Sequence, residues 1–384
     1  MKSIKLLVAL GCLGLSSCTS EREAAPLGET LTADNEISAP SLAFGPNGHL
    51  VVSWAGRNDV HVRRWTGSRW ESLSGGGLSA FPGETRAYWS SLRVDGQGDP
   101  VIAWTEDLPE ELLRKSIFVR RWADGGWVEV GEPLNIDAQT YDAYKPTLQL
   151  DSQGNPLVAW SERNAGSRLA VRRWGPGGWQ ALGPNPIAEG TAWGLELMGD
   201  TPLLMSHRDE DYGRLKTIDV RRWTGSTWEK LGDSVGVQAV APQMRADAAG
   251  NLVLAWLEDG VGYANPPIPD RLQVARWSGT AWEALPDVAV TVGDDSVSIP
   301  ALDLDAEGRP LVAWNHYEDN TQSLRVARWT GQEWNVTVVE EVSAPLLGWF
   351  SRGSSTIGFH PTEGVVVAWT PEESRPLRVL RLLP

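Results

Sequence analysis

The chain has 384 residues, with 49 acidic against 34 basic side chains and a formal net charge of −15. Such an acidic chain argues against nucleic acid as a partner and against adsorption to anionic lipid, because both surfaces repel a negative net charge. Tryptophan is unusually frequent, with 21 residues against 6 tyrosines and 5 phenylalanines, and its spacing supports most of the predictions below.

The first residues predict an export signal. Lys2 and Lys5 give a positive start, and the apolar stretch from Ile4 to Leu15 is too short to span a bilayer as a permanent helix. It ends in Leu-Ser-Ser-Cys at Cys18, which resembles the lipobox of bacterial lipoproteins. Residues 1–17 are therefore expected to be a lipoprotein signal peptide and Cys18 the lipidated residue. The alternative is an ordinary cleaved signal with a chance cysteine.

The cysteines agree with this interpretation, because Cys12 and Cys18 are the only two in the sequence. Removal of Lys2 and Lys5 with the signal would change the net charge from −15 to −17. We expect a protein of the bacterial cell envelope, in the outer membrane or at the cell surface. Its attachment to the membrane would then depend on the lipid anchor alone.

A tryptophan-marked repeat follows the N-terminal segment. In one unit, residues 300–305 alternate apolar and polar, a turn covers 306–309, and residues 310–314 are apolar and end in Trp314. After a variable loop, residues 324–329 alternate again and end in Trp329, and a Thr-Gly turn leads to Trp334. Four short antiparallel strands repeated at about 50 residues are typical of a propeller blade.

Six units carry the Trp-x4-Trp pair, and 18 of the 21 tryptophans belong to the repeat. The blades are expected to begin near Ser41, Ser90, Pro146, Trp193, Pro242, Pro300 and Ser355. The seventh lacks a fourth strand, and Gly28 to Ala33 is predicted to supply it and so close the ring. The sequence thus predicts an all-β, seven-bladed propeller over residues 36–384, with residues 18–35 as lipidated tether and closing strand. Six closed blades with a stray hairpin are the alternative.

The repeat resembles the broad group of sialidase-like, BNR-type and related Trp-rich propellers. The Gly-x-x-Trp turn before the fourth strand occupies the place of their Asp box. The full Ser-x-Asp-x-Gly-x-Thr-Trp pattern and the Phe-Arg-Ile-Pro motif of bacterial sialidases are absent from the sequence. The resemblance therefore implies the fold and does not imply the activity.

Residues that recur from blade to blade are expected to be structural. The Trp pairs are predicted to pack between adjacent blades. An arginine that recurs on the third strand is predicted to stack on a neighbouring Trp and to pair with a carboxylate. These arginines are Arg64, Arg121, Arg173, Arg222, Arg276, Arg328 and Arg381. The aspartates of the first turn are predicted to form that turn, and Glu106, Glu162 and Glu258, two residues after their blade's Trp, occupy equivalent positions that indicate scaffold.

Residues that break the repeat are the candidates for function. All six tyrosines and the three remaining tryptophans fall on the long connections, which share one face of a propeller and also carry many carboxylates. Blade four replaces Ala-Trp-x-Glu by Met-Ser-His-Arg, which points to His207 and its neighbours. The predicted ligand-binding residues are Tyr88, Trp89, Tyr144, Trp193, His207, Arg208, Asp209, Tyr212, Tyr263, His316, Tyr317 and Trp349.

Aromatic rings that stack on sugar faces, combined with carboxylates that accept from hydroxyls, favour a non-enzymatic protein that binds a carbohydrate or a protein ligand on the long-loop face. The alternatives are a sialidase-like glycoside hydrolase or lyase, which requires two carboxylates about 5–10 Å apart, and a scaffold subunit of an envelope complex. No catalytic residue, cofactor or metal ligand is assigned, and the protein is expected to be a monomer.

Overall fold

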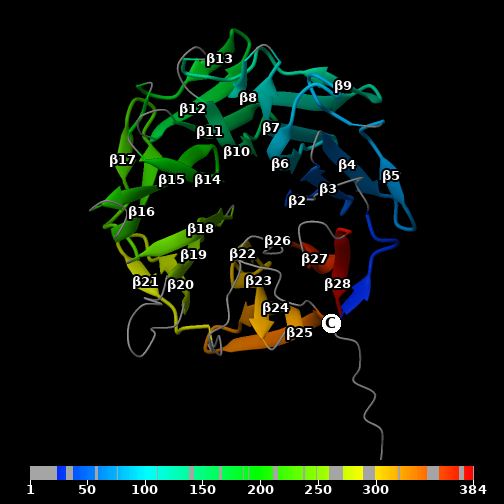
Figure 1. Cartoon of the computed structure of the whole chain (residues 1–384). Helices are drawn as coiled ribbons and strands as arrows, with labels where there is room; N and C mark the ends of the chain where they lie inside the picture. The colour runs from blue at the N-terminus through cyan, green and yellow to red at the C-terminus, as the bar shows by residue number, and fades with distance from the viewer. Residues whose placement is uncertain are drawn as a thin grey trace, which may run out of the picture.

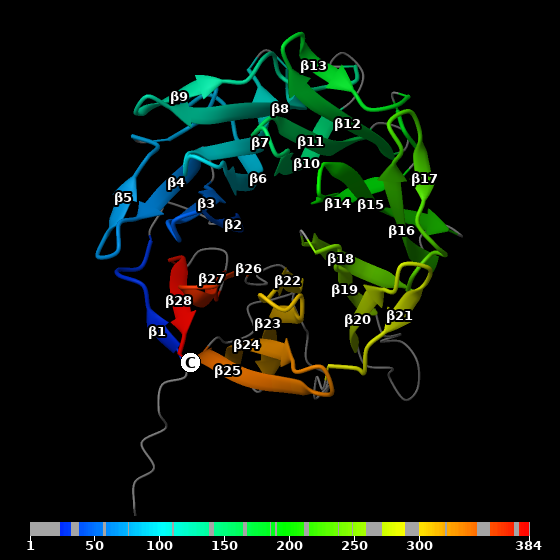
Figure 2. The same cartoon turned by 180° about the vertical axis from the view of Figure 1, so that it is seen from behind.

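The computed structural model describes residues 24–31, 38–56, 59–75, 77–109, 111–137, 142–163, 167–184, 186–188, 190–210, 215–236, 238–247, 249–258, 271–288, 299–318, 321–343, 354–371 and 376–383. These residues form 28 β-strands arranged as a ring of seven sheets (Figures 1 and 2). Each sheet has four antiparallel strands, so the predicted seven-bladed propeller is confirmed. Within the described chain, no helix is long and apolar enough to cross a membrane.

The first three blades follow the chain from the inner to the outer strand of each sheet. Blade 1 contains β2 (Ser38–Phe44), β3 (Leu50–Ala55), β4 (Val60–Trp65) and β5 (Trp70–Ser72). Blade 2 contains β6 (Ala87–Val94), β7 (Pro100–Leu108), β8 (Glu111–Ala123) and β9 (Gly126–Glu129). Blade 3 contains β10 (Asp142–Leu150), β11 (Pro156–Arg163), β12 (Ser167–Gly175) and β13 (Gly178–Ala181).

The next three blades repeat the same order. Blade 4 contains β14 (Thr191–Met198), β15 (Thr201–Glu210), β16 (Leu215–Trp223) and β17 (Trp228–Lys230). Blade 5 contains β18 (Ala239–Ala246), β19 (Leu252–Glu258), β20 (Arg271–Trp277) and β21 (Trp282–Ala284). Blade 6 contains β22 (Ala301–Leu304), β23 (Pro310–Glu318), β24 (Thr321–Trp329) and β25 (Trp334–Ser343).

Blade 7 joins both ends of the described chain. Its inner strands are β26 (Ser354–His360), β27 (Gly364–Thr370) and β28 (Arg378–Leu382), and its outermost strand is β1 (Ala24–Pro26). We call the side that carries the turns between first and second and between third and fourth strands the short-turn face. The opposite side, where second and fourth strands end, is the long-loop face.

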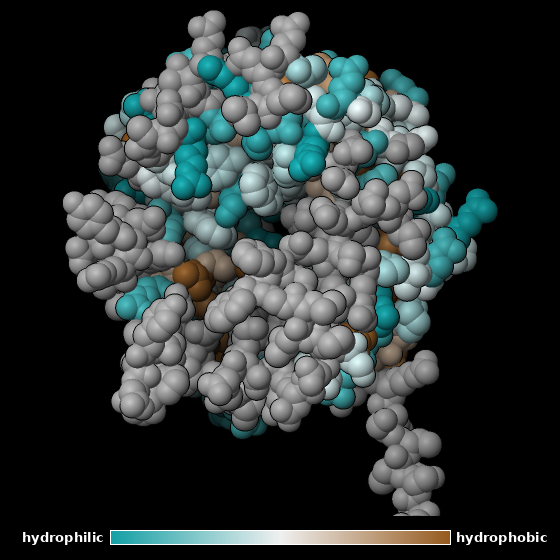
Figure 3. Space-filling view, viewed as in Figure 1, coloured by the Kyte–Doolittle hydropathy of each residue, from teal (hydrophilic) through white to brown (hydrophobic). Residues whose placement is uncertain are grey.

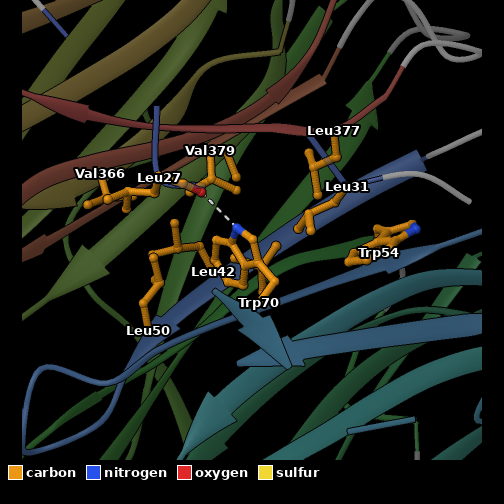
Figure 4. Packing of buried hydrophobic residues seen from close by; sticks show 11 residues of the cluster. Leu27, Leu31, Leu42, Leu50, Trp54, Trp70, Val366, Leu377 and Val379 are labelled. Carbon is orange, nitrogen blue, oxygen red and sulfur yellow. Dashed lines mark hydrogen bonds between the residues drawn. The ribbon is translucent and has the colours of Figure 1, made fainter. Parts of the chain in front are cut away.

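The closing strand lies slightly earlier than predicted. The pairing of β1 with β28 runs from Ala24 opposite Leu382 to Pro26 opposite Leu380, and Leu31 adds an isolated bridge to Leu377. Leu27 and Leu31 are buried between blades 7 and 1, and the Leu27 carbonyl accepts the indole N–H of Trp70 at 2.7 Å (Figure 4). The expected Gly28–Ala33 segment therefore contributes the bridge at Leu31, whereas the strand itself precedes it.

The hydrophobic core lies between neighbouring blades. The repeat tryptophan within the second strand is fully buried in five blades, at Trp54, Trp104, Trp160, Trp314 and Trp369. Each sheet has apolar side chains on both faces, because its two neighbours in the ring cover it from both sides. Full burial of such a large side chain contributes about 2–3 kcal/mol, so these five positions fix the spacing of the blades.

The Trp-x4-Trp pairs also connect adjacent blades, as predicted. In each of six blades the two rings lie 5.2–5.4 Å apart across the turn between third and fourth strands. The second indole N–H donates to a backbone carbonyl of the preceding blade, as from Trp127 to Leu73 at 2.8 Å. The same bond recurs in the other five blades. We call this contact the Trp clasp.

Among the described residues, four of the seven recurring arginines pair with carboxylates, namely Arg64, Arg173, Arg328 and Arg381, and their predicted stacking on Trp rings is not observed. Arg173 and Arg328 bind the turn aspartates of their own blades, Asp151 and Asp305. In the described part of the chain, the guanidiniums that lie over Trp rings belong instead to the preceding residue, with Arg120 5.5 Å and Arg172 5.6 Å from the ring centres. Alternation along a strand explains this, because consecutive side chains point to opposite faces.

The turn aspartates fix the short turns, as predicted. The Asp305 side chain accepts from the backbone N–H groups of Glu307 and Arg309, and its other oxygen accepts from the Arg309 guanidinium at 2.8 Å. Burial alone would raise the pKa of Asp305, but these hydrogen bonds and that from Arg328 outweigh it and hold the pKa below 3.8.

We expect Asp305→Asn to lower the free energy of unfolding by about 2 kcal/mol at pH 7, because it removes charge-assisted hydrogen bonds. A lowered folded-state pKa stabilises above the unfolded value, so the difference from the wild type should shrink as the pH falls below 3.8. Urea unfolding of both proteins at several pH values measures this difference in the free energy of unfolding. Glu307→Gln is the control, because this side chain is 60% exposed. A difference that grows in acid would contradict the assignment.

Candidate functional site

A β-bulge recurs where the inner strands reach the long-loop face. The pairing of first and second strands slips by one residue in each of blades 1 to 5, as between Tyr88 and Ser90. Inner strands cross this bulge, so those of the first five blades begin two to four residues before the predicted positions. A bulge bends its strand and re-aims a side chain. The predicted starts Trp193 and Ser90 lie within or just after it.

Three bulge residues that are not glycine have a positive φ, namely Trp89 at 35°, Lys145 at 53° and Ala241 at 50°. Such a backbone costs of order 1–3 kcal/mol and persists only where the surroundings impose it. A tryptophan in this region is a strong outlier, because its bulk disfavours a positive φ. The strain singles out Trp89 and Lys145 as residues that the fold holds in unusual positions at this rim.

Three aromatic rings form a row across blades 2 and 3. The Trp89 ring lies 5.7 Å from that of Tyr88 and 6.2 Å from that of Tyr144. Trp89 is 36% exposed, whereas the tryptophans of the repeat pack between blades. The Tyr144 hydroxyl is hydrogen-bonded to the Ser167 hydroxyl at 3.1 Å. The row thus combines an accessible indole with polar edges.

A partly buried ion pair supports the first ring of the row. The Lys115 ammonium is 2.8 Å from Asp107 and lies 5.2 Å above the Tyr88 ring, whose hydroxyl donates to Asp107 at 3.1 Å. Burial and the Asp107 charge raise the pKa of Tyr88. Burial would lower the pKa of Lys115, but the bond to Asp107 outweighs it and raises that pKa. Tyr88 is therefore a neutral hydrogen-bonding group held in one orientation.

The row continues into blade 4 through a lysine. The Lys145 ammonium lies 3.9 Å from the centre of the Trp193 ring, and burial lowers the pKa of Lys145. The Trp193 ring meets His207 edge-on at 6.3 Å, and His207 Nε2 donates to the Ala239 carbonyl of blade 5 at 3.0 Å. Among the described residues, the buried Trp193 Nε1 has no hydrogen-bond acceptor. We call Tyr88, Trp89, Tyr144, Lys145 and Trp193 the aromatic rim.

A belt of charged side chains lies deeper, around the axis of the ring. Arg245 Nη1 is 3.1 Å from Glu196, and Arg245 Nε is 3.7 Å from Asp303. Arg93 reaches the same Glu196 oxygen at 3.8 Å. Burial raises the pKa of both Glu196 and Asp303. Figure 3 shows hydrophilic described residues above the centre of the face it views and a small hydrophobic patch beside the centre.

The structure brings together five of the predicted residues, namely Tyr88, Trp89, Tyr144, Trp193 and His207. His316 is buried in β23 of blade 6, opposite Ser323 and two blades from β15, which carries His207 (Figure 1). For Arg208, Asp209 and Tyr317 only the backbone is described, in β15 and β23. Tyr212, Tyr263, Trp349 and Cys18 lie outside the described residues.

Two carboxylates on the same face are scaffold, as their equivalent positions indicated. Glu106 accepts five hydrogen bonds, from the indole of Trp104, two hydroxyls and two backbone N–H groups of the 79–85 segment. Glu162 accepts from the indole of Trp160 at 3.0 Å and from the backbone of Ile136. Each glutamate ties a loop to the buried tryptophan of its own blade.

Lys145 and the residues of the charged belt were not among the predicted ligand-binding residues. Lys145 precedes a proline at the start of a blade, and only the bulge turns it toward Trp193. Arg93, Glu196, Arg245 and Asp303 share one repeat position, two residues before the first turn. The sequence signal for the belt was a charged residue at this position in four blades, in strands whose other residues are mostly apolar or small.

Among the described residues, no group of three histidine, cysteine, aspartate or glutamate side chains is arranged to hold a metal ion.

Comparison with known proteins supports the fold. The sequence matches no protein-family model and no curated protein sequence. Among solved structures, it is similar to a PL25 polysaccharide lyase, an ulvan lyase bound to -[GlcA(1-4)Rha3S]-. The identity is 12%, the match covers 91% of this chain and 94% of the lyase, and the TM-score is 0.61.

Two other solved structures give similar values. Kuenenia stuttgartiensis hydrazine synthase is 11% identical over 92% of this chain and 98% of its own, with a TM-score of 0.58. A catalytically inactive virginiamycin B lyase from Staphylococcus aureus, solved with quinupristin, is 11% identical over 92% and 98%, with a TM-score of 0.56. Identities this low establish a shared architecture and leave activity to be argued from the site.

Proposed function

We propose that the protein is a non-enzymatic, envelope-anchored binding protein that holds a carbohydrate on the aromatic rim of its long-loop face. The observation that carries this proposal is the exposed Trp89 indole, fixed in a strained bulge between Tyr88 and Tyr144. A side chain held in a costly conformation and left accessible is suited to contact a ligand rather than to fill the core.

The chemistry around Trp89 suits a sugar ring. The apolar face of a pyranose can stack on the indole, which contributes contact area at low ordering cost. The Tyr88 hydroxyl with Asp107, and the Tyr144 hydroxyl with Ser167, provide fixed donors and acceptors for sugar hydroxyls beside the ring. The proposed location in the envelope rests on the lipobox-like residues that end at Cys18.

We expect Trp89→Ala to weaken glycan binding by about ten- to a hundredfold, because loss of a stacked aromatic ring removes roughly 1.5–3 kcal/mol. A glycan array identifies the ligand, and titration calorimetry then compares the variants. Trp89→Phe should retain most of the affinity, and Trp89→Gly should lose binding without loss of stability, because glycine accepts a positive φ.

Ile299→Ala is the positional control, because this exposed side chain precedes the first strand of blade 6, away from the row. Binding that survives Trp89→Ala but fails in Ile299→Ala would contradict the proposed position. Failure of the wild type across the glycan array would transfer the proposal to a protein ligand.

A polysaccharide lyase or glycoside hydrolase is the second candidate, and the charged belt favours it. Glu196 and Asp303 are two carboxylates with raised pKa values that flank Arg245 near the axis. Raised pKa values are what a carboxyl group needs in order to act as an acid near neutral pH. The chain length of a glycan incubated with the protein distinguishes binding from cleavage. A binding protein leaves the glycan chain length unchanged, whereas a lyase or a hydrolase shortens it.

A further inference from the structure

The junction between blades 6 and 7 differs from the other six. In blade 7 the two positions of the Trp clasp are occupied by Leu382 and Ala24, which face each other across β28 and β1. The chain after Trp334 also differs, because β25 continues along β24 as far as Ser343. In place of the clasp, the Trp369 indole donates to Glu340 of β25 at 2.9 Å, and Arg378 pairs with the same carboxylate.

A groove of 810 Å³ occupies this junction. Its walls are β25 of blade 6 and the outer strands β1 and β28 of blade 7, which lie side by side in both views of the ring (Figures 1 and 2). The run from Val338 to Glu341 lines it without interruption. The run contains a bulge at Val339, because Leu324 pairs with Glu340 and Arg325 with Val338. Since β25 is the outermost strand of its sheet, its outer edge lies along this wall of the groove.

The edge of β25 is unlike the other outer edges. β25 has ten residues, whereas the fourth strands of the other blades have three or four. It is the outermost strand of its sheet, and among the described residues its outer edge pairs with no other strand. Val336 and Val338 are 41% and 42% exposed along it. Proteins ordinarily shorten, charge or cover such an edge, because it is a template for another strand.

The charges of the groove select the occupant. Glu29 and Glu341 line it, and neither has an ion pair among the described residues. Its one lining cation, Arg378, is already paired with Glu340. The groove therefore presents two exposed valines and a net negative charge beside an open strand edge, which complements an extended segment with alternating basic and apolar residues.

We propose that this groove binds an extended basic and apolar segment of a partner polypeptide, which adds a strand to the outer edge of β25. Main-chain hydrogen bonds to β25 would hold the segment, Val336 and Val338 would pack against its apolar side chains, and Glu29 and Glu341 would face its lysines or arginines. This site is separate from the aromatic rim and does not depend on the proposed glycan function.

The test uses the full chain and a fluorescent ten-residue peptide of alternating lysine and valine. Fluorescence anisotropy should show saturable binding that weakens as salt is raised. The double variant Val336→Lys/Val338→Lys should weaken it at least tenfold. Val128→Lys is the matched control, because Val128 is 55% exposed on β9, a short outer strand. Trp89→Ala should bind the peptide like the wild type, which separates this site from the rim.

Hydrogen exchange locates the bound peptide, and we expect new protection in β25 and not in β9. A peptide of alternating glutamate and valine should bind at least tenfold more weakly than the lysine peptide. The proposal is overturned if the lysine peptide fails to bind, if Val128→Lys weakens binding as much as the β25 variant, or if protection arises elsewhere. It is also overturned if the full chain is a dimer that the β25 variant dissociates, because a second copy would then be the occupant.

Discussion

Glu106→Ala is expected to lower the free energy of unfolding by about 5 kcal/mol or more. The Glu106 side chain is fully buried and accepts from Ser79 at 2.5 Å, Thr85 at 2.7 Å and the indole of Trp104 at 2.7 Å, besides two backbone N–H groups. Alanine leaves these donors without an acceptor, at about 1–3 kcal/mol for each donor that water does not reach. Urea unfolding followed by tryptophan fluorescence measures the change.

Glu258→Ala is the matched control, because Glu258 holds the equivalent position of blade 5 and is only half-buried. We expect Glu258→Ala to lower the free energy of unfolding by less than about 1 kcal/mol. The comparison also separates structure from catalysis. If Glu106 served as a catalytic carboxylate, its replacement would reduce activity and leave stability near that of the wild type, and the hydrogen-bond assignment would be wrong.

Replacement of the leucines that follow the closing strand should destabilise the whole ring. Leu31 is 3% and Leu27 is 9% exposed, and both are packed against blade 7 residues such as Leu377 and Val379. We expect Leu31→Ala and Leu27→Ala each to cost about 2–5 kcal/mol. Leu383→Ala should change the free energy of unfolding by less than about 0.5 kcal/mol, because Leu383 is 48% exposed.

A disulfide between β1 and β28 tests whether the loss of stability in Leu31→Ala comes from opening of the ring. Ala24 and Leu382 are direct partners across β1 and β28, so cysteines at the two positions suit a cross-strand bridge. Oxidation should raise the urea midpoint of the Leu31→Ala protein toward the wild type, and reduction should reverse this. Equal midpoints for the oxidised and reduced proteins would show that closure at β1 does not limit stability.

The architecture could be predicted because it depends on residues that recur. Trp104 and its equivalents are buried for the same reason in six of the seven blades, so their spacing alone reveals the period. The closing strand was predicted from the missing fourth strand of blade 7, but its position was not. Gly28 to Ala33 contains the better strand residues, whereas β1 contains two alanines and a proline and is set by its register against Leu380 to Leu382.

The site could be predicted only in part, because side-chain direction there depends on the bulge. Sequence identified Trp89 and Tyr144 as breaks in the repeat, and the structure places their rings 6.2 Å apart. It could not show that Lys145 turns toward Trp193, since that follows from a positive φ in a strand that the sequence treats as regular. Arg245 was overlooked because its role depends on partners from two other blades.

The position at which the chain enters β1 determines how a lipid-anchored propeller would be oriented relative to the membrane. Ala24 lies opposite Leu382, the last residue of β28, and therefore at the short-turn face. Cys18 precedes Ala24 by six residues, a span of at most about 20 Å even when fully extended. A lipid on Cys18 would thus keep the short-turn face next to the bilayer. The aromatic rim would point outward, away from the headgroups, where a polymer outside the membrane could reach it.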